Sequence, residues 1–278
     1  MHRGYNTWND VGKHLDAAAL EARVDAMVAS GLRDAGYTYF NLDDGWAADA
    51  RDPKTHVLPA SSTAFPKGMK AFADYVHGKG LKLGLYTDRG TQTCAGKPGS
   101  YGYEAVDAKQ YAAWGCDYLK EDNCHAPGGA NNHSEAFYRF GLMRDALNAT
   151  GRPVFFSVCG GGDQAPWNSL AWMAQPPSGG AALANAWRIA PDCVEWVTTL
   201  HALSIDAGLA RFSGPGGFND PDMLLTSTKG AVRKLGPVQS RTQFSIWAVL
   251  AAPLLIGGPI SQLSAWDLET YKNTCFQR

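Results

Sequence analysis

The chain has 278 residues, 45% of them hydrophobic, and its 25 basic and 26 acidic residues leave a net charge of −1. This length allows one large domain or two small ones with a sizeable core. The near-neutral balance gives no electrostatic reason to expect nucleic acid or an anionic membrane as a partner, and the sequence holds no stretch long and apolar enough to span a membrane.

Short apolar runs alternate with amphipathic segments along the chain. In chain order we expect a strand over 5–8, helix 17–30, strand 37–43, helix 67–78, strand 81–88, helix 104–114, strand 118–122, helix 134–149, strands 153–159 and 186–189, helix 194–207, strand 217–222, helix 238–250 and strand 253–257. Such alternation predicts an α/β fold with a parallel sheet, and eight units in about 250 residues fit a (β/α)8 TIM barrel. The alternative is a doubly wound sheet, which normally carries a glycine-rich phosphate loop after its first strand; the sequence has no such loop there.

Charged residues gather at the ends of the predicted strands. A (β/α)8 barrel builds its active site at the carboxyl ends of its strands. A single Asp after a strand is usually a loop or helix-capping residue. Five strands of this chain end in or near carboxylates, which favours an active site; the residues are Asp43, Asp44, Asp88, Glu121, Asp122, Asp192, Asp220 and Asp222.

The strand over 118–122 separates its charges by alternation. Residues two apart share one face of a strand, so Tyr118, Lys120 and Asp122 point one way and Leu119 and Glu121 the other. If Leu119 packs on the helical layer, Asp122 faces the barrel axis and is the better nucleophile. Lys120 beside it would keep Asp122 ionised, as a carboxylate nucleophile requires.

A second carboxylate across a pocket would complete the pair that glycoside hydrolysis uses. Asp192, on a neighbouring loop, could protonate the leaving oxygen, and Arg188 could hold a sugar hydroxyl. Clustered carboxylates could instead hold a metal ion such as magnesium. Two cations among the acids, Lys120 and Arg188, and nine tryptophans suited to sugar stacking favour a sugar over a metal. We therefore expect neither a metal nor a cofactor.

Five longer motifs make the sequence similar to a known family. The chain resembles the α-galactosidase (melibiase) family of glycoside hydrolases, glycoside hydrolase family 27, which also contains α-N-acetylgalactosaminidases. The resemblance runs over nearly all 278 residues, and its motifs are GYNTWN at 4–9, NLDDGW at 41–46, TCAGKPGS at 93–100, YLKEDNC at 118–124 and GGFNDPDM at 216–223.

The resemblance implies a retaining exo-glycosidase on a (β/α)8 barrel that removes terminal α-linked galactose. It implies Asp122 as nucleophile, Asp192 as acid/base and a disulfide between Cys94 and Cys124. The residues matching galactose contacts are Trp8, Asp43, Asp44, Tyr86, Lys120, Arg188 and Asp222.

The sequence departs from the family pattern in two places. After the fifth strand the family's galactosidases carry Glu and Trp behind a Cys, and the acetylgalactosaminidases carry Ser; this chain reads Cys159 followed by Gly160, Gly161, Gly162 and Asp163. A changed preference at the sugar's 2-position, such as α-N-acetylgalactosaminidase activity, is therefore an alternative. The family's C-terminal β-sandwich is also missing, so we expect residues 1–278 to be a catalytic barrel alone. A truncated, inactive galactose-binding protein is the third interpretation.

The cysteines and glycosylation sequences bear on the compartment. A Cys94–Cys124 bridge would imply an oxidising environment, and the sequons at Asn132 and Asn148 lean the same way, towards a secreted or lysosomal or vacuolar protein. The first five residues carry no signal peptide, which suggests a trimmed N-terminus. Cys193 follows Asp192 and could pair with Cys159.

Overall fold

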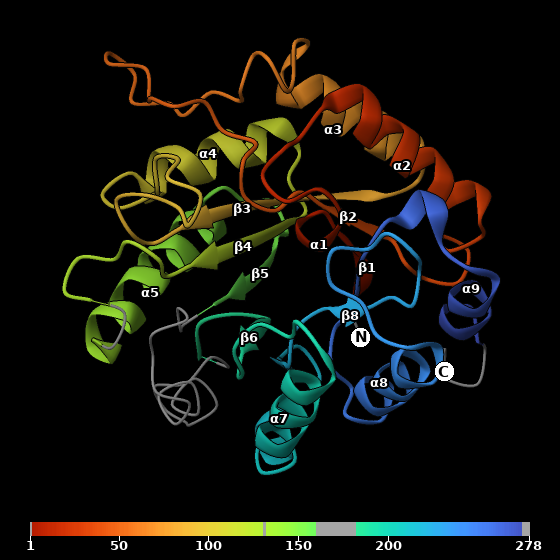
Figure 1. Ribbon diagram of the computed structural model, residues 1–278. Helices are drawn as coiled ribbons and strands as arrows, with labels where there is room; N and C mark the ends of the chain where they lie inside the picture. Colours follow the sequence, from red (N-terminus) through yellow and green to blue (C-terminus); the bar gives the residue numbers. More distant parts are fainter. Residues whose placement is uncertain (1, 130–131, 160–181, 274–278) are drawn as a thin grey trace.

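A computed structural model describes residues 2–129, 132–159 and 182–273, and its strands form one parallel sheet (Figure 1). The strand order is β7-β6-β5-β4-β3-β2-β1-β9-β8. The strands are β1 Arg3–Asn6, β2 Tyr39–Asn41, β3 Lys82–Asp88, β4 Tyr118–Asp122, β5 Phe155–Val158, β6 Ala186–Arg188, β7 Phe218–Asp220, β8 Leu224–Leu225 and β9 Leu254–Gly257.

The sheet closes on itself through β7 and β8. β7 pairs with β6, whereas β8 pairs with β9. Only three residues separate the end of β7 from the start of β8. The two short strands are therefore successive parts of one barrel strand, which gives eight strands around the barrel. The predicted (β/α)8 barrel is confirmed.

Helices lie outside the strands (Figure 1). They are α1 Trp8–Val11, α2 Ala17–Ala29, α3 Gly68–Gly78, α4 Glu104–Trp114, α5 His133–Ala149, α7 Trp196–Asp206, α8 Pro237–Val249 and α9 Ala265–Tyr271, with short 3-10 turns at Ala210–Phe212 and Ile260–Gln262. The six predicted helices lie within two residues of observed ones. The described helices include none that is long and apolar enough to cross a lipid bilayer.

The first strand is shifted by two residues from its prediction. It was expected over residues 5–8, but β1 ends at Asn6 and Trp8 begins the short helix α1. The Asn6 side chain accepts a hydrogen bond from the Trp8 amide at 2.8 Å, which turns the chain at once into a helical turn. This turn brings Trp8 to the mouth of the barrel instead of leaving it on a strand.

The barrel interior is closed below the charged residues by stacked rings. The His2 ring lies 4.0 Å from Tyr39, 4.4 Å from Phe155 and 4.9 Å from Tyr118, measured between centroids. Burial lowers the pKa of His2 to about 3, so the imidazole is neutral at physiological pH. A dry, uncharged floor of this kind strengthens the electrostatic interactions of the groups above it.

Gly84 on β3 makes room for a buried amide inside the barrel. A Cβ atom at this position would lie 2.0 Å from Oδ1 of Asn41, which no side chain could tolerate. Glycine is therefore required for β2 and β3 to lie side by side with Asn41 pointing inward.

Candidate active site

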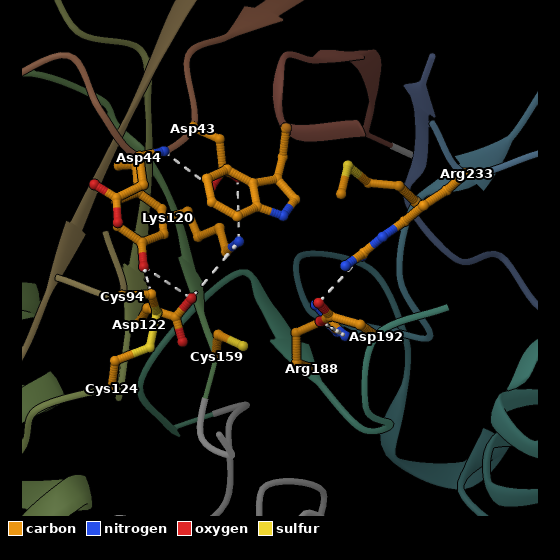
Figure 2. A pocket seen from close by; sticks show the side chains of 13 residues that line it. Asp43, Asp44, Cys94, Lys120, Asp122, Cys124, Cys159, Arg188, Asp192 and Arg233 are labelled. Carbon is orange, nitrogen blue, oxygen red and sulfur yellow. Dashed lines mark hydrogen bonds and ion pairs between the residues drawn. A yellow bond between two sulfur atoms is a disulfide. The ribbon is translucent and has the colours of Figure 1, made fainter. Parts of the chain in front are cut away.

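A cavity of about 190 Å³ opens at the carboxyl ends of the strands (Figure 2). It is smaller than the ligand pockets of about 300–1,000 Å³ that hold drug-sized molecules, and its size suits one sugar ring better than a longer glycan. Among the described residues its lining comprises Trp8, Asp43, Asp44, Tyr86, Cys94, Lys120, Asp122, Cys124, Cys159, Arg188, Asp192, Met223 and Arg233.

Asp122 ends β4 with its carboxylate in the cavity. The Tyr86 hydroxyl donates a hydrogen bond to its Oδ2 at 3.0 Å, and the Asn123 amide donates to Oδ1 at 2.9 Å. Burial and the neighbouring carboxylates hold the pKa of Tyr86 well above its usual value, so the hydroxyl stays a donor. Asp122 thus lies in a fixed orientation with its charge directed into the pocket.

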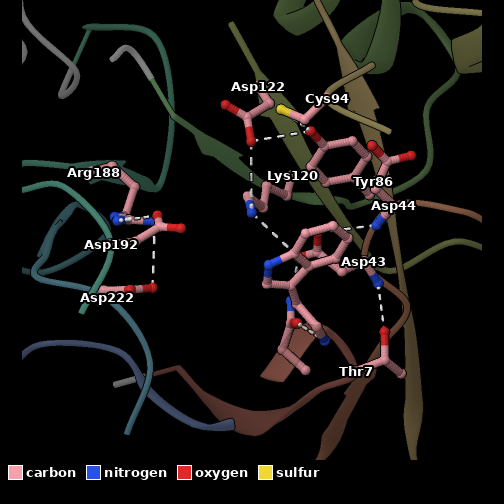
Figure 3. A network of polar contacts seen from close by, with 12 residues as sticks. Thr7, Asp43, Asp44, Tyr86, Cys94, Lys120, Asp122, Arg188, Asp192 and Asp222 are labelled. Atoms are coloured by element: carbon pink, nitrogen blue, oxygen red, sulfur yellow. Dashed lines mark hydrogen bonds and ion pairs between the residues drawn. The ribbon is translucent and has the colours of Figure 1, made fainter. Parts of the chain in front are cut away.

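Lys120 joins two carboxylates of the pocket (Figure 3). Its Nζ lies 3.2 Å from Asp43 Oδ2 and 3.7 Å from Asp122 Oδ2. Burial alone would lower the pKa of Lys120, but the charges of Asp43 and Asp122 outweigh burial and raise it. Asn6 also donates to Asp43 Oδ2 at 2.8 Å. The ammonium is therefore held charged beside Asp122.

Asp44 and the disulfide fix the loop that follows β3. The Ala95 amide donates to Asp44 Oδ2 at 2.7 Å, and the neighbouring Cys94 is bonded to Cys124, just beyond the end of β4. Burial raises the pKa of Asp44 despite these donors. The predicted Cys94–Cys124 disulfide is present and forms part of the pocket wall.

Asp192 lies on the opposite wall between two arginines (Figure 2). Its Oδ1 is 3.1 Å from Arg188 Nη2 and its Oδ2 is 3.3 Å from Arg233 Nη1. Burial would raise the pKa of Asp192, but the positive charges of Arg188, Lys120 and Arg233 outweigh it and lower the pKa to about 2. In the free protein this carboxylate is ionised.

Asp222 does not line the cavity but contacts Arg188, which does. Its carboxylate lies 3.3 Å from Arg188 Nη1 and accepts the Cys193 amide at 2.7 Å. Burial raises its pKa to about 6, against the lowering effect of Arg188. The backbone of Asp222 has φ of 90°, which is unfavourable outside glycine. Such strain is typical of functional positions, and the surrounding hydrogen bonds hold it in place.

The structure brings most of the predicted site residues together. All nine lie at one end of the barrel, and eight of them line the cavity; Asp222 is the exception. The prediction that Lys120 and Asp122 share a face opposite to Glu121 agrees with their positions. Sequence reasoning missed Cys159, Met223 and Arg233 as pocket residues. For Arg233 a signal existed, because residues 226–236 hold three basic side chains and no acidic one.

Two sequence expectations need correction, and a third concerns residues that the structure does not describe. Asp88 does not line the pocket, because its carboxylate turns to the amides of Gly90 and Cys124, at 2.7 and 2.8 Å. The suggested Cys159–Cys193 bridge is wrong, since both thiols are free: Cys159 lines the cavity, whereas Cys193 points to the Pro221 carbonyl at 3.4 Å. Gly160 and the residues up to Asp163 lie outside the described residues.

Glu121 is away from the pocket, as predicted, but it is not on a solvated face. Its side chain is fully buried, and neither carboxyl oxygen has a hydrogen-bond partner among the described residues. Burial raises its pKa well above the usual value, which favours the neutral acid.

The chemistry of the donors also argues against a metal at Asp122. Two carboxylates and two sulfurs, from Asp88, Asp122, Cys94 and Cys124, lie within 4.8 Å of one another. The sulfurs are joined as a disulfide and are not thiolates, which are the form that binds metals. Lys120 further opposes a second cation at this place.

Known proteins resemble this chain over almost its whole length. An alpha-galactosidase from Cyamopsis tetragonoloba is 40% identical over 272 residues, which is 97% of this chain but 61% of that protein. Alpha-galactosidase I from Mortierella vinacea superposes with a TM-score of 0.85 at 32% identity, covering 99% of this chain and 71% of that one. The alpha-galactosidase of Saccharomyces cerevisiae, solved with raffinose, gives a TM-score of 0.83 at 32% identity, covering 97% of this chain and 61% of that one.

The family comparison agrees with these relatives. The family described as alpha galactosidase A matches residues 10–275, which include every pocket residue named above except Trp8. Together with the closed barrel and the two facing carboxylates, this match identifies the chain as a member of the alpha-galactosidase A family.

Proposed function

We propose that this chain is the catalytic barrel of a retaining exo-α-galactosidase, which hydrolyses terminal α-linked galactose from oligosaccharides or glycoconjugates. The observation that carries the proposal is the pairing of Asp122 and Asp192 on opposite walls of a cavity suited to one sugar ring. Two carboxyl groups flanking a sugar are what glycoside hydrolysis requires. The family membership supports the choice of galactose.

The reaction takes two steps. In the first, Asp122 attacks the anomeric carbon and the bond to the leaving oxygen breaks, while Asp192 gives that oxygen a proton. In the second, Asp192 takes a proton from water, the water oxygen attacks the same carbon, and the ester to Asp122 breaks. Galactose leaves with its α configuration, and both carboxyl groups return to their starting states.

The remaining pocket residues bind the sugar. Asp43 and Asp44 accept hydrogen bonds from neighbouring hydroxyls, and Lys120 donates to a hydroxyl while keeping its contact with Asp122. A site built to hydrogen-bond a hydroxyl rejects the epimer that leaves its buried groups unpaired. Trp8 offers its ring to the apolar face of the sugar.

Asp192 needs a proton before the first step. With Arg188 and Arg233 beside it, the carboxylate is ionised. Substrate binding must therefore loosen at least one of these ion pairs. Arg188 is held by Asp222 and by the Ala190 carbonyl, whereas Arg233 stands on a loop and is 26% exposed. Arg233 is the partner that can move.

An oxidising compartment, secreted or lysosomal or vacuolar, suits the Cys94–Cys124 bridge. Asn148 is exposed in the last turn of α5 and could accept a glycan. Asn132 is also exposed; its side-chain oxygen caps α5 by accepting the Glu135 amide at 3.1 Å, and a glycan on the side-chain nitrogen would leave that acceptor in place.

Two chromogenic substrates test the proposal. We expect the protein to release p-nitrophenol from the α-galactoside faster than from the α-N-acetylgalactosaminide, and proton NMR to detect α-galactose as the first product. Faster hydrolysis of the acetylated substrate would replace the proposal with a 2-position variant of the same mechanism. Binding of galactose without release of either product by the folded protein would refute it in favour of a binding protein.

A further inference from the structure

The leaving-group side of the pocket has a cation that the sugar does not need. Asp192 must face the glycosidic oxygen, so the groups beyond Asp192 contact what is attached to that oxygen. Arg233 is the pocket residue beside Asp192 that comes from the loop between β8 and α8 (Figure 2). If the proposed function is right, Arg233 therefore lies next to the leaving group.

Arg233 has donors to spare. A guanidinium carries five N–H groups, and among the described residues Asp192 is its one hydrogen-bond and ion-pair partner, through Nη1 at 3.3 Å. Arg188 differs, because it is 6% exposed and bound to Asp192, Asp222 and the Ala190 carbonyl. The free edge of Arg233 can therefore bind a second anion without leaving the pocket wall.

The loop around Arg233 strengthens the positive charge. Residues 226–236 include Lys229, Arg233 and Lys234 and no acidic residue, and both lysines are exposed. The groups that face Asp192 are Arg188 on β6, Lys120 on β4, Arg233 on this loop, and Asp222 and Cys159 at greater range. Among the described residues, Asp192 is the acid that pairs with Arg233, and Arg188 already neutralises part of its charge.

We propose that Arg233 is a specificity-determining residue that binds a carboxylate on the leaving group, so that the pocket prefers α-galactosides of acidic aglycones. Arginine and carboxylate pair in a planar, two-pronged geometry that lysine cannot reproduce. As Arg233 turns to the substrate carboxylate, it releases Asp192, which then takes up the proton that it must deliver. The inference rests on the proposed galactosidase activity.

Matched substrates and a matched loop variant test the inference. The substrates are 4-carboxyphenyl α-galactoside and its methyl ester, which differ in one charge. Wild type is compared with Arg233→Gln, with Arg233→Lys, and with Lys229→Gln, which removes a loop charge that does not line the pocket. Dividing the loss of kcat/KM for the acid by the loss for the ester cancels the different reactivities of the two phenols.

For Arg233→Gln we expect the acid to lose about 10-fold or more in kcat/KM beyond the loss of the ester, the size typical of a hydrogen bond between charged groups. Arg233→Lys should lose less, and Lys229→Gln should leave the ratio unchanged. Added salt should lower the wild-type preference. Equal losses for both substrates, or the same ratio in Lys229→Gln, would overturn the inference.

Failure of the inference and failure of the proposed function are distinguishable. If wild type hydrolyses the ester without any effect of charge, only the role of Arg233 is refuted. If the folded wild type hydrolyses neither substrate, the proposed function is refuted, and calorimetric binding of the two glycosides then decides about Arg233. If wild type binds the acid more tightly than the ester and Arg233→Gln abolishes this difference, Arg233 recognises the carboxylate. Equal dissociation constants for the two glycosides would refute that role.

Discussion

The two walls of the pocket hold their carboxylates by different means. On one wall Asp122 ends a regular strand, is 11% exposed and is held by a tyrosine hydroxyl, a backbone amide and Lys120 (Figure 3). On the other, Asp192 stands on a loop, is 40% exposed and is held by two arginines. In the proposed mechanism, the first arrangement holds an anion in place for attack. The second stabilises an anion that, in the same mechanism, must become an acid, so its partners have to move away during the reaction.

Replacing Asp122 should cause the largest loss of activity. We expect Asp122→Ala to lower kcat/KM by about 10⁴-fold or more, the size seen when a covalent nucleophile is removed. Added azide should restore turnover of an activated aryl α-galactoside by attacking from the vacated face. Mass spectrometry and NMR should then identify a β-galactosyl azide, whose inverted configuration places the nucleophile at residue 122.

Glu121 provides the control for this variant. It is the neighbouring carboxyl group on the same strand, but it faces the helical layer and burial raises its pKa well above the usual value. Glu121→Gln should therefore keep its activity, because the pocket loses no charge. If Glu121→Gln were as inactive as Asp122→Ala while still folded by circular dichroism, the assignment of the two faces of β4 would be wrong.

The loss of activity on replacing Asp192 should depend on the leaving group of the substrate. Removing a general acid costs about 10²–10⁴-fold when the leaving group needs a proton. Asp192→Ala should therefore lose much of kcat/KM on methyl α-galactoside and far less on a dinitrophenyl α-galactoside. Azide should now give the α-galactosyl azide, because it attacks the intermediate on Asp122. A uniform loss on both substrates, or a β product, would contradict the assignment.

The disulfide should matter more to stability than to the chemical step. Cys94 and Cys124 are 30 residues apart in the sequence, and removing a native bridge of this kind costs about 2–5 kcal/mol of unfolding free energy. We expect Cys94→Ala/Cys124→Ala to unfold at lower urea concentration and to raise KM, since the bridge anchors the loop whose Ala95 amide holds Asp44. A reducing agent should destabilise wild type but leave the double variant unchanged; an equal effect on both would assign the loss to other cysteines.

The same contrast explains what could be predicted from the sequence. On β4 the alternation of side chains is set by the strand itself, so Lys120 and Asp122 could be placed on one face and Glu121 on the other without a structure. The strand ends followed from the apolar runs before them. Trp8 was predicted to end the first strand but begins α1, because the Asn6 side chain redirects the backbone after β1.

The loops of the Asp192 wall follow no such period. Arg233 enters the pocket through a tertiary contact with Asp192, and Asp222 adopts its positive φ because Arg188, Cys193 and Trp247 hold it through hydrogen bonds and charge. The basic composition of residues 226–236 hints at a positively charged loop, but no local pattern shows that Arg233 meets Asp192 or that Asp222 takes a positive φ. The suggested Cys159–Cys193 bridge failed for the same reason, since the direction of each thiol depends on the loop that carries it.

The smallest expected effect is that of the Arg233 charge on the pKa of Asp192. The pKa of Asp192 is lowered to about 2 by its cationic neighbours, so removing one of them must raise it. A general acid acts only while protonated, so a higher pKa moves the alkaline limb of the kcat profile, which reports the enzyme–substrate complex, to higher pH. For Arg233→Gln, measured on p-nitrophenyl α-galactoside, we expect a shift of less than about one pH unit, because partly exposed ion pairs contribute only about 0.2–1 kcal/mol. The acidic limb should stay in place, and Lys229→Gln should move neither limb. A shift of the acidic limb instead would mean that Arg233 acts on the nucleophile and that the two walls are not independent.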